Sequence, residues 1–399
     1  MSKSLFLILS IFSFQLFAQA DFEKKLQKQL ILAEDGSIIQ IEAGNFQLTK
    51  SLSLEGKKNI IIRGSGIDKT VLSFKGQVQG AEGIKVTNCE NIIIEDLTAE
   101  DSKGDLIKTM HVKGMTFRRL KTAWTGGPKS TNGSYALYPV LCENVVIDSC
   151  IAIGASDAGI YVGQSKNIIV RNCEAYQNVA GIEIENSLNA EVFNNKAIGN
   201  TGGILVFDLP DLIQKKGGHV RVYHNVVQEN NLKNFAPKGN IVGNVPKGTG
   251  MMVLATSDVE IFDNQILNNQ TIGVSVVSYF MTELKIKDKE YDPYPTGIFI
   301  HDNHFERNAG RAPADSRFGK LYRFKLRFGR KLPFVVYDGI LNPEKLGKDG
   351  QYYPEYRICV KNNINQFSAM LDAEHDFKNI QIGEDYFNCE LGMIKSIQF

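Results

Sequence analysis

The sequence has little net charge, little proline and, after its first twenty residues, no long hydrophobic run. Its 45 Lys and Arg face 44 Asp and Glu, a formal charge of +1 at pH 7, so no overall field favours nucleic acid or an anionic membrane. The 399 residues include only 11 prolines, against 36 glycines and 31 asparagines. No later segment approaches the roughly 20 apolar residues of a membrane-spanning helix. These absences exclude a disordered, collagenous or polytopic membrane protein, and the abundant Gly and Asn favour an all-β chain with many turns.

Cysteine is also scarce, and none of the six residues has the spacing of a metal site. Cys359 and Cys389 lie outside the regular part of the chain, where a disulfide in an exported protein is as reasonable as two free thiols. The other four recur at fixed phases of the repeat described below, which predicts buried thiols that point into the core: Cys89, Cys142, Cys150 and Cys173.

The first twenty residues have the pattern of a secretory signal peptide. A basic start at Lys3 precedes an apolar run over residues 5–17, and Ala18-Gln-Ala20 fits cleavage before Asp21. The apolar run is too short for a membrane anchor. The sequence therefore predicts an exported protein, secreted or periplasmic, with no integral membrane segment after cleavage.

A repeat of 22 residues organises the centre of the chain. Gly159-Ile-Tyr-Val162, Gly181-Ile-Glu-Ile184 and Gly203-Ile-Leu-Val206 align without a gap, and each is followed by a second apolar segment. A fixed period of this length indicates a solenoid, because one repeat cannot bury its apolar face alone and must stack on its neighbours. Further copies of the motif begin at Gly83, Gly250 and Gly297.

Two polar positions follow the second apolar segment in a fixed phase. Asn tolerates the left-handed backbone of a tight turn, and its amide can hydrogen-bond to the same amide one rung away. Short strands with stacked polar ladders predict a right-handed parallel β-helix, an all-β single-stranded solenoid with about 22 residues per rung. A β-sandwich is the alternative, but its turns recur at a shorter spacing. The first position carries Cys150, Cys173, Asn195, Asn225, Asn264 and Asn303, and the second, five residues later, carries Ala155, Asn178, Asn200, Asn230, Asn269 and Asn308.

The two ends of the solenoid need covers. Phe22–Leu32 has helical periodicity and is expected to cap the N-terminal end. We assign residues 21–310 to the β-helix with this cap, and residues 311–399 to irregular terminal rungs and a C-terminal cap. The chain is expected to be a monomer.

The repeat also predicts which side chains point outward. Ile160 and Val162 should face the core, so Tyr161 and Gly163 should face out. Neighbours in such a column lie about 4.8 Å apart. The first outward column is predicted to contain Lys85, Lys108, Tyr138, Tyr161, Glu183 and Leu205; the second, Thr87, Met110, Val140, Gly163, Glu185 and Phe207; and the turn beside them, Asn88, His111, Leu141, Gln164, Asn186 and Asp208.

These columns gather acidic, basic and phenolic groups on one face, which we interpret as the candidate site. Glu183, Glu185 and Asp208 could hold a hard cation such as Ca²⁺. A cation there would neutralise the carboxylate of a uronate and so acidify its C5 proton. The alternative is an ordinary strand face that is polar because water lies outside. The groups that could remove the C5 proton are Lys108, His111, Tyr138 and Tyr161.

Three insertions interrupt the repeat, at residues 122–134, 208–218 and 232–249. Loops on one side of a solenoid commonly wall a binding groove. Trp124 is the only tryptophan and could either stack on a sugar ring or lie buried beneath its loop. The candidate substrate-binding residues in or beside the insertions are Trp124, Asn186, His219 and Lys238.

Residues 154–165, 179–187 and 201–210 resemble a bacterial family of exported right-handed parallel β-helix repeat proteins. The likeness extends through Asn234-Phe-Ala-Pro237 and Gly248-Thr-Gly250 to the tail cysteines, so it covers most of the mature chain. That family has no settled activity. The resemblance therefore implies a fold more than a reaction.

More broadly, the chain is similar to the pectate-lyase-like superfold, which includes alginate lyases and mannuronan epimerases and implies an acidic polysaccharide as the partner. The calcium-assisted alginate lyases of that superfold pair a Lys and an Arg with a metal held by carboxylates. Lys108 and the pair Glu183 and Glu185 match by position, but no Arg stands out in the columns. The epimerase run Asp-Pro-His-Asp is absent, and Asp292-Pro-Tyr-Pro295 departs from it.

The sequence leaves the class of function open. The first hypothesis is an enzyme that acts on uronate polymers as a lyase or C5-epimerase. The second is a non-catalytic, secreted solenoid that binds carbohydrate or builds a surface structure. Glycoside hydrolysis comes third, because paired carboxylates alone would permit it.

Overall fold

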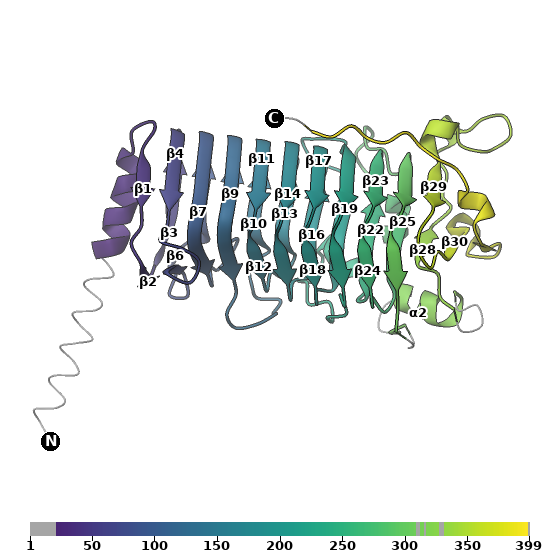
Figure 1. Ribbon diagram of the computed structural model, residues 1–399, viewed down its shortest axis with the longest axis horizontal. Helices are drawn as coiled ribbons and strands as arrows, with labels where there is room; N and C mark the ends of the chain where they lie inside the picture. Colours follow the sequence, from purple (N-terminus) through teal and green to yellow (C-terminus); the bar gives the residue numbers. More distant parts are fainter. Residues whose placement is uncertain (1–20, 309–311, 315–316, 327–330, 398–399) are drawn as a thin grey trace, which may run out of the picture.

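A computed structural model describes residues 21–308, 312–314, 317–326 and 331–397 of the chain. The predicted signal peptide lies outside the described residues. Figure 1 shows an elongated stack of short strands with a helix at its N-terminal end. Among the described residues, the strands form one sheet of nineteen (sheet A) and one of twelve (sheet B), and each strand pairs in parallel with the strand one rung away, apart from the antiparallel pair β30 and β31. The predicted parallel β-helix is confirmed.

Sheet B is the flat wall that carries the predicted columns. Its neighbours in the sheet are separated in sequence by a full turn of the coil, as expected for stacked rungs. Its strands are β3 (Lys50–Glu55), β6 (Gln79–Thr87), β8 (Ile107–Met110), β10 (Tyr135–Val140), β13 (Ala158–Gly163), β16 (Ala180–Glu185), β19 (Gly202–Phe207), β22 (Thr249–Leu254), β25 (Ile272–Val277), β28 (Val335–Tyr337), β30 (Ser368–Met370) and β31 (Gln381–Ile382).

Sheet A forms the rest of the coil, and most rungs contribute two strands to it. Its strands are β1 (Ile38–Gln40), β2 (Gly44–Gln47), β4 (Lys58–Arg63), β5 (Thr70–Ser73), β7 (Glu90–Glu100), β9 (Lys113–Ala123), β11 (Glu143–Asp148), β12 (Ile151–Ile153), β14 (Lys166–Arg171), β15 (Glu174–Tyr176), β17 (Leu188–Phe193), β18 (Lys196–Ile198), β20 (Gly218–Tyr223), β21 (Val226–Gln228), β23 (Val259–Phe262), β24 (Gln265–Leu267), β26 (Ile298–His301), β27 (His304–Glu306) and β29 (Ile358–Lys361).

Helices lie only at the ends and in the loops of the described chain. Residues 21–32 are helical and place Leu26 and Leu30 in the core of the first rungs, where the sequence predicts a cap. No helix among the described residues is long and apolar enough to cross a membrane. The remaining helices are α2 (Arg317–Phe324) and the 3-10 turns η1 (Ile241–Asn244), η2 (Tyr279–Thr282), η3 (Pro343–Lys345), η4 (Pro354–Tyr356), η5 (Ala373–His375) and η6 (Asp385–Phe387).

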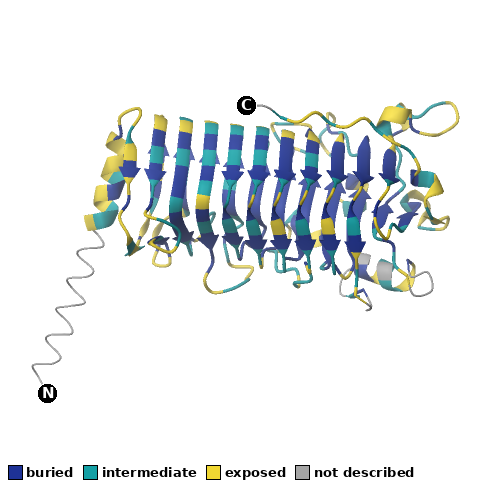
Figure 2. Cartoon of the chain, viewed as in Figure 1, coloured by how far each residue is buried: buried dark blue, intermediate teal, exposed yellow. Residues whose placement is uncertain are grey.

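The core of the coil follows from the alternation of side chains along each strand. Ile182 and Ile184 of β16 point inward and join one hydrophobic cluster that runs the length of the solenoid. From β13 to β25, however, every residue of sheet B is buried, as Figure 2 indicates by continuous dark strands in that part of the molecule. Strands that are buried on both faces must be covered outside the coil as well as packed inside it.

The asparagine ladders are present as predicted over most of their length. The Asn195 amide donates to the Asn225 side-chain oxygen at 3.0 Å, and the same contact recurs in every next step to Asn363. The second ladder runs from Asn178 to Asn269. The prediction is wrong for Asn308, whose backbone N–H instead donates to the Asn268 side chain at the exposed edge.

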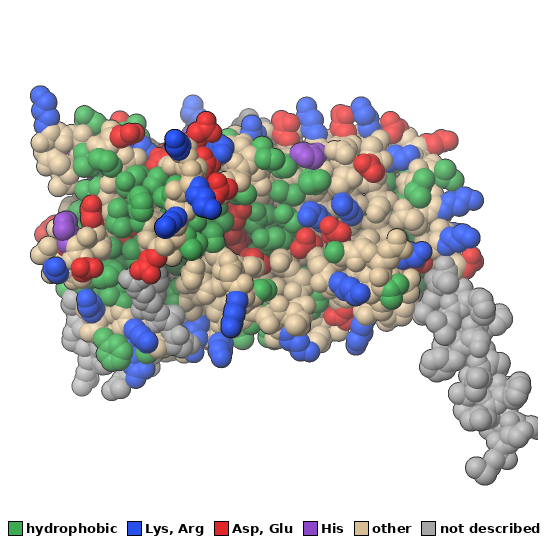
Figure 3. Space-filling model, turned by 180° about the vertical axis from the view of Figure 1, so that it is seen from behind, with side chains coloured by type: hydrophobic (Ala, Val, Ile, Leu, Met, Phe, Trp, Pro, Cys, Tyr) green, Lys and Arg blue, Asp and Glu red, His purple; other side chains and the backbone are tan. Residues whose placement is uncertain are grey.

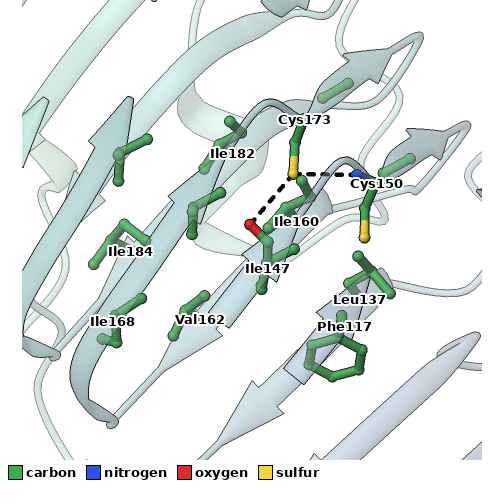
Figure 4. Packing of buried hydrophobic residues seen from close by; sticks show 14 of the residues in the cluster. Phe117, Leu137, Ile147, Cys150, Ile160, Val162, Ile168, Cys173, Ile182 and Ile184 are labelled. Carbon is green, nitrogen blue, oxygen red and sulfur yellow. Dashed lines mark hydrogen bonds between the residues drawn. The ribbon is translucent and has the colours of Figure 1, made fainter. Parts of the chain in front are cut away.

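The cysteines also lie where the sequence places them. The four thiols of the regular rungs are free and buried. Figure 4 shows Cys150 and Cys173 stacked within the core, where the Cys150 N–H points to the Cys173 sulfur at 3.4 Å. Cys359 and Cys389 form a disulfide, so the alternative of two free thiols is wrong. This bond attaches the C-terminal tail, which runs back along the solenoid in Figure 1.

On the face drawn in Figure 3, Lys and Arg side chains lie beside Asp and Glu side chains, with hydrophobic side chains between them. Some of the charged side chains form specific ion pairs, since the nearly inaccessible Glu95 carboxylate contacts both Arg63 and Arg118.

The turn that follows sheet B forces a left-handed backbone on residues of several types. Leu141 has φ 54°, and its counterparts Asn88 and Asn186 have φ 55° and 43°. A left-handed backbone is costly for Leu and much less so for Asn. We expect Leu141→Asn to raise the free energy of unfolding by about 0.5–1 kcal/mol. Urea unfolding measures this, and a loss of stability would show that the packing of the Leu141 side chain outweighs its backbone cost.

Candidate functional site

The strand register confirms both predicted columns on the outer face of sheet B. Lys108 pairs with Lys85 on one side and with Tyr138 on the other. Two rungs beyond Tyr138, Glu183 pairs with Tyr161 and with Leu205. The second column is equally regular, since Gly163 pairs with Val140 and Glu185 with Phe207. The structure therefore brings the predicted acidic, basic and phenolic residues onto neighbouring rungs.

The acidic residues of these columns do not face solvent, however. The exposed fractions of Glu183, Glu185 and Asp208 are 3%, 7% and 2%. Asp157, which precedes β13, is 7% exposed and interacts electrostatically with both glutamates. We call these four residues the acidic cluster. The expectation of an open polar face is wrong at these rungs, because loops cover them.

Three loops cover the acidic cluster, and each is attached to it. Loop 208–218 folds back so that the Gly217 N–H donates to the Asp208 carboxylate at 2.8 Å. In loop 232–248, the Asn240 amide donates to Asp157 at 3.2 Å. In loop 278–296, the Tyr291 hydroxyl donates to the backbone carbonyl of Asp208. The sequence identifies the first two loops as insertions in the repeat, but it does not identify loop 278–296.

Apolar side chains fill the space between these loops and sheet B. Leu205, Phe207, Met252 and Leu254 of the strands form a second hydrophobic cluster with Val242 and other residues of the loops. The carboxyl groups of the acidic cluster thus lie in a largely apolar layer outside the coil. Burial in such a layer disfavours the charged form of a carboxyl group.

Burial accordingly raises the pKa of every member of the acidic cluster. Loss of solvation raises the pKa of Asp157 to about 7, that of Glu185 to about 7 and that of Asp208 to about 8. The pKa of Glu183 is raised well above its ordinary value, first by burial and then by the charges of Asp157 and Glu185. Glu183 and Glu185 share a hydrogen bond. A carboxylate with a pKa near 7 is suited to accept a proton at neutral pH.

A tyrosine cluster connects the acidic cluster to the exposed part of the face. The Tyr161 hydroxyl donates to the Glu185 carboxylate at 2.7 Å, and its ring lies 4.2 Å from Tyr135 and 5.0 Å from Tyr138 between centroids. The Lys108 ammonium lies 4.6 Å above the Tyr138 ring. Burial raises the pKa of Tyr161 well above its ordinary value, so this phenol carries its proton at neutral pH. A cation–ring contact, a ring–ring contact and one hydrogen bond thus connect Lys108 to Glu185.

We expect Tyr161→Phe to raise the pKa of Glu185 further above 7, because the hydrogen bond from Tyr161 lowers it at present. Carbon-detected NMR titration of the glutamate carboxyl groups measures the change. Tyr176→Phe is the matched control, since the Tyr176 hydroxyl also donates to a glutamate, Glu174, but on sheet A. An unchanged Glu185 titration in Tyr161→Phe would contradict the assigned bond.

The arrangement does not fit a metal ion as it stands. Over the described ranges, no group of three or more His, Cys, Asp or Glu side chains is placed to hold one. Glu183 Oε2 and Asp208 Oδ1 are buried without a hydrogen-bond partner, and the carboxyl groups of the acidic cluster would have to lose their protons to bind a cation. Ca²⁺ at Glu183, Glu185 and Asp208 stays a prediction, and no step below is derived through it.

The predicted substrate-binding residues do not come together. Trp124 is 5% exposed and donates its indole N–H to the Ser102 carbonyl, so of the two possibilities the buried one is correct and its ring cannot stack on a sugar. Asn186 is buried, and its side chain holds loop 208–218 by bonds to Leu209. His219 lines a cavity of about 680 Å³ beneath the C-terminal tail.

The last two predicted residues are exposed. Lys238 lies in loop 232–248, two residues before Asn240. His111 occupies the left-handed turn after β8, with φ 55°. Within the described chain, neither residue forms a hydrogen bond or an ion pair with the acidic cluster, so their proposed roles stay predictions.

Sequence reasoning missed Asp157, Tyr135 and Tyr291. Asp157 and Tyr135 do not occupy an outward column of the repeat, and Tyr291 lies in an unrecognised insertion. One signal could have found Asp157: it directly precedes the strand that carries Tyr161, as an acidic residue between two small ones. Nothing in the period of the repeat indicates that loops would bring these side chains together.

Comparison with known proteins agrees with this architecture. Residues 49–213 match the family model described as the right handed beta helix region. The chain is a right-handed parallel β-helix protein. Over 228 residues this β-helix protein is 25% identical to the pre-neck appendage protein of Bacillus phage B103, a match that covers 48% of this chain and 25% of that protein. The chain therefore spans about a quarter of the length of this curated relative.

Two solved structures share the fold over most of the chain. The A-module of mannuronan C-5 epimerase AlgE4 from Azotobacter vinelandii superposes with a TM-score of 0.55 at 13% identity, covering 87% of this β-helix protein and 92% of the module. The A-module of AlgE6 from the same organism gives 0.50 at 15% identity, covering 88% and 91%. At these identities the likeness shows the fold alone.

Proposed function

We propose that this β-helix protein is exported and acts on an acidic polysaccharide along the outer face of sheet B, with lyase or C5-epimerase chemistry on uronates. One observation carries the proposal. The Tyr161 hydroxyl is bonded to the buried Glu185 carboxylate at 2.7 Å, and the Tyr161 ring contacts the Tyr138 ring at the edge of the exposed face. The Lys108 ammonium, paired with Asp105 at 3.8 Å, lies over the Tyr138 ring, so a proton donor and acceptor pair lies one aromatic ring away from a cation. The fold shared with mannuronan C-5 epimerases supports the substrate class.

The residues suggest a division of roles. Lys108 can pair with the uronate carboxylate and so make the C5 proton more acidic. Tyr161 then accepts that proton on its oxygen while its own proton passes to Glu185. In elimination, the C4–O bond breaks, a C4=C5 double bond forms, and water protonates the leaving oxygen. In epimerisation, a water molecule on the opposite face of the ring returns a proton to C5 instead. In both cases the remaining hydroxide takes up the proton held by Glu185. Because its pKa is raised, Tyr161 is not a free base, and Glu185 is the proton acceptor.

The test is incubation of the purified protein with alginate and with pectin, with and without Ca²⁺. Ultraviolet absorbance detects new unsaturated ends, and NMR detects a changed uronate composition. We expect Tyr161→Phe to lower the turnover number by about 100-fold or more. Tyr176→Phe on sheet A should leave it unchanged. Equal activity in the wild type and Tyr161→Phe would show that Tyr161 and Glu185 take no part in the reaction.

A non-catalytic role is the second candidate, favoured by the burial of Glu183 and Glu185 at 3% and 7% exposure. A solenoid whose carboxyl groups only fasten loops would bind glycans or build a surface structure. In that case both polysaccharides should stay unchanged under all conditions while glycan binding remains measurable. If neither turnover nor glycan binding is detected, both candidate functions are contradicted.

A further inference from the structure

The outer face of sheet B changes abruptly from accessible to closed along its first column. Lys85, Lys108 and Tyr138 are partly exposed. One rung further, the exposed fraction of Tyr161 is 4%. Beyond Tyr161 every member of the column stays at or below 6% to the last regular rungs: Glu183, Leu205, Met252, Ser275 and Val336. The boundary lies between β10 and β13.

Over strands β19, β22 and β25, the loops leave no room for a sugar. The space between the loops and strands β19, β22 and β25 contains a cavity of about 30 Å³, lined by apolar residues such as Phe207 and Met252. A single water needs about 10–15 Å³ by this kind of measure. A polysaccharide therefore cannot continue along the face under the loops.

The loops that close the face are fastened at several points. The Gln164 side chain accepts the Ile213 N–H at 2.9 Å, and the Asn186 side chain holds Leu209. Lys215 of loop 208–218 forms an ion pair with Asp288 of loop 278–296 at 2.7 Å. These contacts, with that of Asn240 to Asp157, make a wall beside the tyrosine cluster and not a single flexible flap.

We propose that this face is a blind groove that takes the end of a uronate chain. The floor consists of Lys85, Lys108 and Tyr138 on three successive rungs about 4.8 Å apart. A chain lying along the solenoid axis on this floor stops at Tyr161, with its terminal residue beside the proposed proton path. The inference rests on the proposed function and adds to it: the substrate is a chain end or a short oligosaccharide, and the reaction releases short products.

Binding stoichiometry tests the groove without requiring turnover. Alginate fractions of increasing length are titrated with the full protein, and analytical ultracentrifugation counts the molecules bound per chain. A blind groove predicts a count that stays constant as the chains lengthen. A count that rises in proportion to length would overturn the inference and leave the proposed function standing. Absence of binding and turnover on both alginate and pectin would overturn the proposed function itself.

Two variants sharpen the result. Lys108→Ala should weaken binding of short alginate oligomers by about tenfold, whereas Lys166→Ala, at an exposed position on sheet A, should not. Replacing residues 235–243 by two glycines removes part of the wall, and several molecules should then bind one long chain. If that variant does not fold, the count for the intact protein still decides between the two outcomes. Equal binding by Lys108→Ala and the wild type would show that the oligomer does not bind on the floor formed by Lys85, Lys108 and Tyr138.

Discussion

Between pH 5 and pH 8, the free energy of unfolding should fall by several kcal/mol, up to about 9 kcal/mol if the three groups titrate independently. Burial raises the pKa of Asp157 and Glu185 to about 7 and that of Asp208 to about 8, while unfolded carboxyl groups titrate near pH 4. A group whose pKa is higher in the folded state stabilises the fold while it is protonated. That stability is complete below about pH 4 and is lost as the pH rises through the folded-state value. The acidic cluster therefore destabilises the protein towards pH 8.

Urea unfolding at a series of pH values measures this slope. Glu183→Gln should flatten it, because the substitution removes one carboxyl group whose pKa is raised well above its ordinary value in the folded state. Glu95→Gln is the control: the arginines around Glu95 lower its pKa, so its contribution changes only below about pH 4.5. A free energy of unfolding that is constant from pH 5 to pH 8 would mean that solvent reaches the cluster.

Asn225→Ala should lower the free energy of unfolding by about 3–5 kcal/mol. The Asn225 amide donates to the Val192 carbonyl and to Asn264, and its oxygen accepts both the backbone and the side-chain N–H of Asn195. Alanine removes all four bonds inside the solenoid, where water cannot replace them. Buried donors and acceptors left without a partner cost more than a typical bond contributes.

Asn45→Ala is the matched control, because Asn45 is exposed on β2. It should change the free energy of unfolding by less than about 0.5 kcal/mol. Circular dichroism before unfolding checks that both variants keep their strand content. A loss below about 1 kcal/mol in Asn225→Ala would show that the rungs tolerate a break in the ladder and that strand pairing alone holds them.

The sequence was sufficient for the coil because the coil is periodic. The 22-residue repeat that relates Tyr161 to Glu183 also correctly assigns side chains as distant in sequence as Lys85 and Phe207 to the outer face of sheet B. The same phase predicts which thiols are buried. It fails first at Asn308, where the repeat itself ends and a different contact satisfies the backbone.

The candidate site was predictable only in part, for a physical reason. Membership of Glu183 and Glu185 in one face follows from strand alternation, but their burial depends on where three loops fold back, and loops have no period. Asp157 and Tyr291 lie in turns and loops, not in strands, so the repeat does not predict that they join the cluster. The buried Trp124 shows that a residue in an insertion can pack against the core instead of contacting a ligand.

The ladders have a consequence for how such a chain can diversify. Consecutive rungs are joined by the same amide contact whether the partners are 22, 30, 39 or 60 residues apart in sequence. Segments of very different length can thus be inserted before or after a strand of sheet B while the rungs keep their stacking. Grafting or trimming loop 208–218, between β19 and β20, should alter what the molecule recognises while the scaffold retains its dimensions.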